Sequence, residues 1–500
     1  MAGRLPNDRL QHLIAQVGVS YAALARTVCQ VAAENGDQGF RCDKSFVAHW
    51  VAGTRPQPRT AAYLIEALSR RLGRVLGPAD LGLGSADERI FDGPALAADP
   101  VAGLALLARA DVDRRTLIGG MAYSVAAPML PLQQPEITAR ADLVRSRARA
   151  TVGTGDVAAV RTMTTTFNAA DERLGGGHAR SAVVEYLATD VAGYLRGDFA
   201  TDDVRRAMFA AGAQLSYLAG WKAHDLGLSG LAQRYYLYSF QLAAQADPRA
   251  HAAYALRILA HQAMDLGRHE HCVELADAAL ARAKGRVDAD TESLFWLTAT
   301  RAHAADGNSR EALVALSTAE RLIGRAGGDA GPEWAALGGP AEARLASQAG
   351  KALQAMGDLP QAQEQFRRSA RCWDPVTHPR IYALTLANLA ETQCAQGNVE
   401  QVCQTWHQAL DGMAGIRSAR TREAVRSMRA HLAVYRGRGL AAPGGWRPGP
   451  AISADNRQIV GCRMWTVMEE ERARPAVRHG VVRVPQSGKC GGSPALRRRP

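Results

Sequence analysis

Apolar residues recur at helical spacing in four short stretches near the start of the chain. This spacing predicts helices over residues 7–17, 21–36, 44–52 and 61–73, with no strand signal between them. The inner faces of these helices are expected to consist of Leu10, Leu13, Ile14, Val17, Leu24, Val28, Val31, Phe46, Val47, Trp50, Leu64, Ile65 and Leu68. Four short amphipathic helices in about 75 residues indicate a compact helical domain.

Capping residues mark the ends of these four helices. An N-cap side chain accepts a hydrogen bond from a free backbone N–H group, and Ser20, Asp43 and Thr60 stand where such a residue is expected. A glycine stands at the end of each predicted helix or directly after it and is expected to end it. These glycines are Gly18, Gly36, Gly53 and Gly73.

The third predicted helix carries polar and basic residues on the side away from its apolar residues. In a helix-turn-helix, the second helix of the pair enters the major groove of DNA with its N-terminal residues toward the base edges. The stretch 20–52 has this form, so we expect its outer side chains to contact bases and the flanking arginines to contact phosphates. The outer residues are Lys44, Ser45, Ala48 and His49, and the flanking arginines are Arg41, Arg55 and Arg59.

A small helical bundle with merely solvated charges is the alternative, and spacing alone does not separate the two. The stretches YAALA, DKSFVAHWVAGTRP, AAYLIEALSRRLG and LGPADLGL, however, resemble the lambda-repressor-like (XRE-type) head of actinobacterial helix-turn-helix regulators. The resemblance spans residues 5–84 and implies a DNA-binding domain. The connection from the second to the third helix, Gln30 to Cys42, is longer than in a minimal repressor.

The chain from residue 137 to 436 is helical by pattern and repeats itself. Small turns recur at Gly197, Gly227, Gly267, Gly307, Gly357 and Gly397, with spacings of 30, 40, 40, 50 and 40 residues. Stretches such as HEHCVELADAAL and SREALVALSTAE follow these turns, with small and apolar residues at i, i+3 and i+4. A helix, a tight turn and a second helix at a near-fixed period predict an α-solenoid.

These repeats resemble tetratricopeptide (TPR) repeats, whose turn also carries a glycine. Their spacing departs from the usual period of ~34 residues, and an irregular helical bundle is the alternative. Stacked helix pairs form a concave face, and we expect this face to accept a peptide or another protein.

Positive charge is concentrated at the two ends of this 500-residue chain of net charge +12. Residues 1–84 hold ten Lys/Arg and six Asp/Glu (+4), residues 441–500 hold eleven and four (+7), and residues 85–440 hold 39 and 38 (+1). A basic head on a neutral body favours contact with nucleic acid through the head. The Arg-, Pro- and Gly-rich tail has no periodicity, which predicts disorder; non-homologous coding sequence is the other explanation.

The segment between head and repeats predicts a linker with one helix within 101–120. Arg114 and Arg115 precede an apolar, Ala-rich run, as in a Tat export signal, but such a signal is expected near an N-terminus. A buried linker helix is therefore the preferred interpretation. Eight scattered cysteines without a C-x-x-C pair favour a reducing cytoplasm, and no apolar run is long enough to span a membrane.

No stretch of the sequence carries a catalytic or metal-binding motif. His269, His271 and Cys272 lie close together but diverge on a helix, and SGKC at 487–490 lacks the rest of a phosphate-binding loop. We therefore expect a protein that is not an enzyme and that uses no metal or cofactor.

The sequence thus predicts an all-α protein with a helix-turn-helix domain (1–84), a linker (85–136), a TPR-like repeat domain (137–436) and a basic tail (437–500). We expect a cytoplasmic, sequence-specific transcriptional regulator that binds an operator as a homodimer. Its repeats are expected to serve dimerisation and the binding of a protein or peptide partner. By analogy, such architectures in actinobacteria are linked to development and secondary metabolism. The alternative is a TPR-type interaction scaffold without DNA-binding activity.

Overall fold

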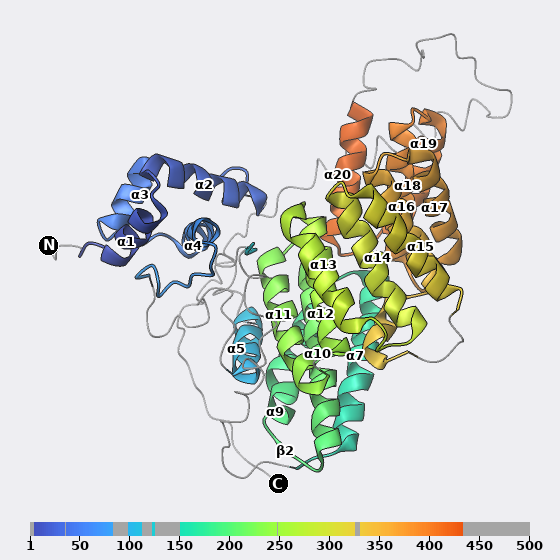
Figure 1. Ribbon diagram of the computed structural model, residues 1–500, viewed down its shortest axis with the longest axis horizontal. Helices are drawn as coiled ribbons and strands as arrows, with labels where there is room; N and C mark the ends of the chain where they lie inside the picture. The colour runs from blue at the N-terminus through green and yellow to red at the C-terminus, as the bar shows by residue number, and fades with distance from the viewer. Residues whose placement is uncertain are drawn as a thin grey trace, which may run out of the picture. The chain divides into compact units, whose positions relative to one another are not determined.

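The computed structural model describes residues 5–35, 37–83, 99–112, 123–125, 151–247, 249–325 and 331–433. In these residues the protein is all-α (Figure 1), as predicted. The extended segments among them are β1 (Thr151–Val152) and β2 (Asp198–Phe199), which pair in parallel with Thr151 beside Asp198. The tail 437–500, Gly36 and the pair Arg114–Arg115 lie outside the described residues.

The head consists of α1 (Asp8–Val17), α2 (Tyr21–Glu34), α3 (Lys44–Val51) and α4 (Pro58–Leu72). All of the predicted inner residues except Val17 and Phe46 are buried in one core, and Val17 packs against it half-buried. Phe46 was wrongly assigned to the core, since its side chain is 52% exposed. The reason is that α3 has only eight residues, so its narrow inner face is filled by Val47 and Trp50.

Most of the predicted caps of the head helices are confirmed. Ser20 Oγ accepts a hydrogen bond from the Ala23 amide at 3.2 Å, and Asp43 Oδ1 accepts from the Ser45 amide at 2.8 Å. Gly18 and Gly73 end α1 and α4 in the left-handed conformation. The Thr60 cap is wrong. Helix α4 begins at Pro58, three residues before the predicted start at residue 61, because Pro58 fits the first turn, where no backbone N–H donor is needed.

The body is a series of helix pairs, as the glycine pattern predicts. The pairs are α10 (Asp202–Asp225) with α11 (Ser229–Ala246), α12 (Ala250–Asp265) with α13 (His269–Ala283), α14 (Ala289–Ala305) with α15 (Ser309–Ile323), α16 (Ala341–Ala355) with α17 (Leu359–Cys372), and α18 (Pro379–Ala395) with α19 (Val399–Met413). Five of the six predicted turn glycines join these pairs at positive φ: Gly227, Gly267, Gly307, Gly357 and Gly397. The sixth, Gly197, instead precedes β2.

Further helices precede, interrupt and follow the five pairs. They are α7 (Thr154–Leu174), α8 (Arg180–Tyr186), the π-helical turn η5 (Leu187–Val191), α9 (Ala192–Tyr194), the 3₁₀ turn η6 (Glu333–Gly338) and α20 (Ala419–Ala433). The linker contributes α5 (Pro100–Val112), whose Val101, Leu104 and Leu107 belong to the same core as α8 to α12. Residues 100–112 therefore form a buried helix, whereas the rest of the stretch 101–120 lies outside the described residues.

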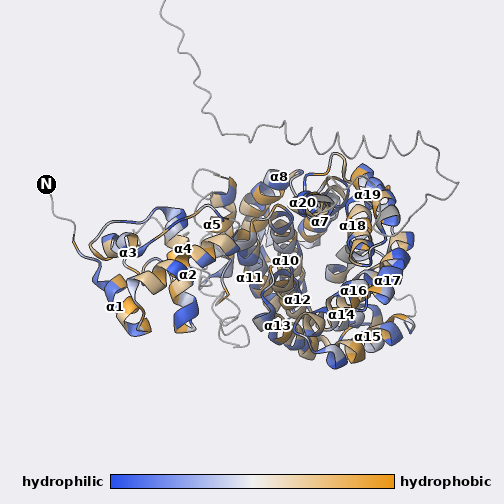
Figure 2. Ribbon diagram, turned by 90° about the horizontal axis from the view of Figure 1, so that it is seen from above, coloured by the Kyte–Doolittle hydropathy of each residue, from blue (hydrophilic) through white to orange (hydrophobic). Residues whose placement is uncertain are grey.

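The first helices of the five pairs are arranged in a ring (Figure 2). Helices α10, α12, α14, α16 and α18 follow one another round this ring, and α7 and α20 complete it. The two ends of the body are joined through backbone hydrogen bonds: Arg417 N donates to Leu174 O at 2.9 Å, and Gly177 N donates to Arg417 O at 3.0 Å. The solenoid therefore closes on itself.

Buried charges hold this closure together. Arg380, at the start of α18, forms ion pairs with Asp171 of α7 at 2.7 Å and with Asp225 of α10 at 3.2 Å. All three side chains are 0% exposed. Lys222 Nζ donates to Asp171 Oδ1 at 3.1 Å, and Ser418 Oγ donates to Asp225 Oδ1 at 2.8 Å. We call this set of five residues the clasp.

Close helix packing within the first pair depends on Gly220 of α10. A Cβ atom at this position would lie 2.6 Å from Tyr236 Cε1 and 3.1 Å from Tyr235 Cβ of α11. We expect Gly220→Ala to be destabilising, because overpacking costs about 1–3 kcal/mol and outweighs the gain in helix propensity of about 1 kcal/mol. Thermal unfolding of the full chain measures the effect.

The matched control for Gly220→Ala is Gly193→Ala. Gly193 lies in α9, and a Cβ atom there would meet no atom within 4 Å. This variant is expected to be neutral or slightly stabilising. Equal thermal midpoints for the two variants would contradict the close approach of α10 and α11 at Gly220.

Candidate functional site

The outer face of α3 presents the residues that the sequence assigned to base contact. Lys44, Ser45, Ala48 and His49 are all exposed. Together with Ser20, Tyr21 and Ala22, they line a shallow hollow between the starts of α2 and α3. The structure thus brings these four residues together on one face.

Helix α3 is held in place by hydrogen bonds at both ends and by its buried inner residues Val47 and Trp50. The Ser45 and Phe46 amides donate to the Asp43 carboxylate, and these bonds hold the pKa of Asp43 below its usual range. At the other end, Asn7 N donates to Val51 O at 2.8 Å and ties α3 to the start of α1. A face fixed in this way is suited to matching a rigid surface.

The three arginines assigned to phosphate contact differ in their surroundings. Arg55 is exposed and has no ion pair or hydrogen bond with the described residues. Arg41 donates to Gln38 O at 2.7 Å, so its guanidinium is partly engaged by its own loop. Arg59 forms an ion pair with Asp37 at 3.1 Å, and its Nε donates to Tyr63 Oη at 2.8 Å.

These contacts change the expected role of Arg59. Through Asp37, Arg59 fastens the connection that precedes α3 to the start of α4. The same connection is held by Cys42 N, which donates to Cys29 Sγ at 3.2 Å. Arg59 therefore stabilises the position of the loop, whereas Arg55 and Lys44 form no hydrogen bond or ion pair with the described residues.

Phe46 adds an exposed aromatic ring to α3, which the sequence did not predict. Its ring centroid lies 6.3 Å from that of Trp50. A phenylalanine at helical spacing looks like a core residue in a sequence, and only the shortness of α3 indicates otherwise.

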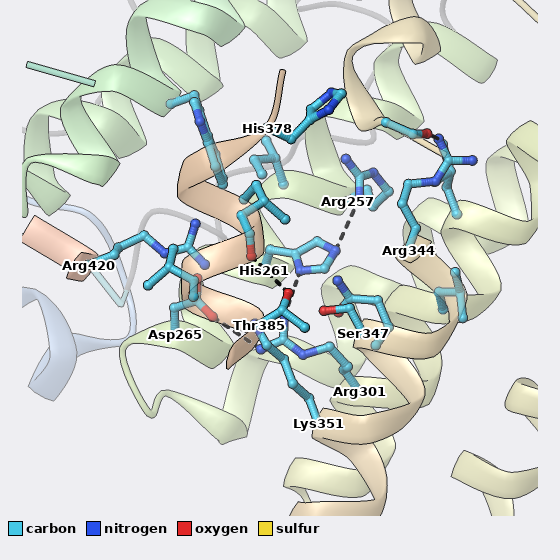
Figure 3. Close-up of a pocket in the computed structure, with 18 of the residues that line it drawn as sticks. Arg257, His261, Asp265, Arg301, Arg344, Ser347, Lys351, His378, Thr385 and Arg420 are labelled. Atoms are coloured by element: carbon cyan, nitrogen blue, oxygen red, sulfur yellow. Dashed lines mark hydrogen bonds and ion pairs between the residues drawn. The ribbon is translucent and has the colours of Figure 1, made fainter. Parts of the chain in front are cut away.

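A second site, which the sequence did not predict, lies inside the ring of helices that forms the body. It is a cavity of about 320 Å³ lined by side chains of α7, α10, α12, α14, α16, α18 and α20. Five basic side chains line it against two carboxylates: Arg257, Arg301, Arg344, Lys351 and Arg420 against Glu172 and Asp265. Figure 3 shows these basic side chains and Asp265 gathered around His261.

Aromatic and aliphatic side chains form the rest of the cavity wall. They include Tyr217, Trp221, Tyr254, Trp373 and Leu297. Arg257 packs over the Tyr254 ring with its guanidinium carbon 4.4 Å from the centroid, and Arg420 packs over Trp221 at 5.5 Å. The π electrons of an aromatic ring attract a cation that stacks on its face, and this attraction stabilises the charged form where water is partly excluded.

Two of the five basic residues are paired with carboxylates. Arg301 Nη2 donates to Asp265 Oδ1 at 3.1 Å, and Arg344 Nη2 lies 2.9 Å from both carboxylate oxygens of Asp290. Burial alone would raise the pKa of Asp265, but its contacts with His224, Arg301 and Lys351 hold that pKa well below the usual range. Asp265 therefore remains an anion that compensates Arg301.

His261 lies between two guanidinium groups. Arg257 Nη1 lies 3.1 Å from its Nε2 atom, and Arg301 Nη1 lies 3.1 Å from its Nδ1 atom. Burial and these two arginines hold the pKa of His261 well below its usual value, so the ring is neutral. A neutral imidazole accepts a hydrogen bond at only one nitrogen. The N–H group of one of the two arginines therefore faces the N–H group of the ring.

The described residues hold no group of three or more His, Cys, Asp or Glu side chains that suits a metal ion. Cys272 is buried, with its Sγ atom 3.1 Å from the His269 carbonyl oxygen. None of the helices in the described part of the chain is both long and apolar enough to cross a membrane.

The head matches a known protein family. Residues 10–84 match the family described as the SP15 N-terminal domain, a stretch that contains all four helices of the head except the first residues of α1. No curated protein matches the chain. The match covers the head alone. The matched family is described differently from the XRE-type heads, so the resemblance of this head to XRE-type heads stays a prediction.

Proposed function

We propose that the protein is a sequence-specific DNA-binding transcriptional regulator. The observation that carries the proposal is the fixed outer face of α3, on which Lys44, Ser45, Ala48 and His49 are exposed side by side. The net charge of +4 over residues 1–84, against +1 over residues 85–440, supports it. Basic charge on the head favours a polyanionic partner.

In this proposal α3 lies in the major groove of DNA. Lys44, Ser45 and His49 offer polar groups to base edges, and Ala48 and Phe46 offer apolar contact to thymine methyl groups. Arg55 contacts a phosphate on the flank, whereas Arg41 and Arg59 mainly position the loop before α3.

The body provides the partner-binding and dimerising part of the regulator in this proposal. One head buries little DNA surface, so we expect a homodimer in the cytoplasm on a two-fold operator with half-sites one helical turn apart. A protein or peptide partner on the repeats is part of the proposal. A scaffold that does not bind DNA is the competing function.

The test is binding of the full chain to genomic DNA fragments over a series of salt concentrations. We expect site-selective binding that weakens steeply with salt. Lys44→Ala should cost about 1–3 kcal/mol at the selected site, because it removes a base contact. Arg55→Ala should weaken all fragments alike and lower the salt slope by about one.

Arg74→Ala is the matched control for these variants. Arg74 is an exposed head arginine just beyond α4 and is not among the residues of the α3 face. Arg74→Ala removes the same charge as Lys44→Ala and should lower the affinity for DNA less than Lys44→Ala does. Absence of binding, or binding that Lys44→Ala leaves unchanged, would favour the scaffold.

A further inference from the structure

Three of the cations that line the cavity of the body have no carboxylate partner. Arg257, Lys351 and Arg420 form no ion pair with the described residues, whereas Arg301 and Arg344 are paired with Asp265 and Asp290. Glu172, the other carboxylate in the wall, lies 3.5 Å from Arg380. The cavity therefore holds an excess of positive charge, which is costly because the three unpaired side chains are half-buried.

Hydrogen-bond donors in the cavity are also unpaired. Arg257 Nε, Arg344 Nε and Arg420 Nη1 are buried and have no acceptor. His261 Nε2 also lies 3.0 Å from Thr298 Oγ1, whose own hydrogen is donated to Leu294 O. His261 therefore donates from Nε2 to Thr298 and accepts from Arg301 at Nδ1, which leaves Arg257 facing an N–H group.

We propose that this cavity binds a small organic phosphate whose phosphate group lies among Arg257, Arg301, Lys351 and Arg420. A phosphate group carries about −1.5 to −2 charges and several acceptor oxygens, so it compensates the unpaired cations and donors together. A single carboxylate supplies only one charge. This inference does not rest on DNA binding, because its test measures ligand binding alone.

The rest of the ligand is expected to be flat or apolar and no larger than about a mononucleotide. The cavity of about 320 Å³ is at the lower end of the volumes of small-molecule sites. Tyr217 and Tyr254 line it with ring centroids 5.3 Å apart, and Trp373 also lines it. Such rings stack on a planar group.

Lys351 supports the inference through its protonation. Burial and the nearby cations lower its pKa to about 7. The charged or titratable groups that act on it are Arg301, Asp265, Arg420, Glu391 and His261. An incoming anion raises this pKa again, so binding at pH 8 should take up a proton. Calorimetry in buffers of different ionisation enthalpy measures this uptake.

The first experiment uses the full chain with adenosine monophosphate, pyrophosphate, adenosine and citrate as probes. Trp221 and Trp373 line the cavity, so tryptophan fluorescence reports occupancy. We expect saturable binding of adenosine monophosphate or pyrophosphate with Kd below about 1 mM, and weaker binding of adenosine and citrate. Arg257→Gln should weaken the binding of these two phosphates by at least about 10-fold.

Arg368→Gln is the matched control, because Arg368 lies exposed on α17 and pairs with Glu342 at 3.1 Å. It should leave the affinity unchanged. Lack of saturable binding of both phosphates overturns the proposal, as does binding that Arg257→Gln does not weaken. Tighter binding of citrate than of either phosphate overturns the assignment to phosphate.

Lys351→Met separates a ligand-binding role from a structural one. Removing an amine from among cations should raise the thermal midpoint of the ligand-free chain by about 2–4 °C, abolish the proton uptake at pH 8 and weaken phosphate binding by at least about 10-fold. A lower midpoint with unchanged affinity would identify Lys351 as structural and overturn its place in the site.

Discussion

Arg380→Ala is expected to lower the free energy of unfolding of the body by about 3–5 kcal/mol. The guanidinium of Arg380 compensates Asp171 and Asp225, both fully buried. Its removal leaves Asp171 paired with Lys222 alone and Asp225 without an ion pair to the described residues. Arg380 and Arg420 now hold the pKa of Asp225 below its usual value although burial alone would raise it. Without Arg380, a buried carboxylate must be protonated or exposed.

The measurement is urea unfolding of the full chain at pH 7, followed by tryptophan fluorescence. Trp221 is a suitable reporter, since the Arg380 guanidinium lies over its ring at 5.8 Å. Arg368→Ala is the control, because it breaks an exposed ion pair worth about 0–1 kcal/mol. A loss of less than about 1 kcal/mol for Arg380→Ala would show that the clasp does not hold the ring closed.

A second variant tests whether the charges or the shape of the clasp matter. Arg380→Met combined with Asp225→Leu removes a cation and an anion and keeps apolar volume. Such replacements of a buried pair are often neutral. We therefore expect the double variant to be more stable than Arg380→Ala, which would assign the loss in the single variant to the unpaired carboxylates.

Local features of the fold were predictable from the sequence. Five of the six turn glycines adopt positive φ, as expected where the chain reverses after a helix. Ser20 and Asp43 cap α2 and α3 as predicted. These features depend on a few neighbouring residues, so a single sequence contains the information for them.

The closure of the ring was not predictable in the same way. The clasp joins Asp171, Asp225 and Arg380, which are separated by 54 and 155 positions and belong to no common motif. Lys222 and Asp225 each look like a surface residue in a helical pattern. Only the superhelical path of the repeats brings these charges together, and that path follows from the packing angle of every pair.

The cavity left a signal that the sequence reasoning did not use. Six positions before the five turn glycines that join helix pairs stand, in order, Trp221, His261, Arg301, Lys351 and Glu391. The first four of these line the cavity, and Glu391 acts on the pKa of Lys351. A polar or aromatic residue at a fixed position of successive first helices therefore indicates a shared inner face.

Asp111→Ala is expected to cost about 3–5 kcal/mol, because it leaves Arg180 buried without its partner. The carboxylate of Asp111, at the end of α5, forms an ion pair with Arg180 of α8, and both side chains are at most 6% exposed. Tyr235 Oη of α11 donates to the same carboxylate at 2.8 Å. Asp111 therefore fixes the C-terminal end of the linker helix on the body.

Hydrogen exchange of the full chain locates this effect within the molecule. Loss of Asp111 should release α5 and speed exchange of its amides, while α14 to α19 keep their protection. Tyr235→Phe is the graded control, since it removes one hydrogen bond to a charged group and should cost about 1.5–3 kcal/mol. Unchanged protection of α5 in Asp111→Ala would mean that its apolar residues Val101, Leu104 and Leu107 suffice to hold it. Faster exchange confined to α5 would instead assign its attachment to the buried ion pair, because the apolar contacts are the same in both proteins.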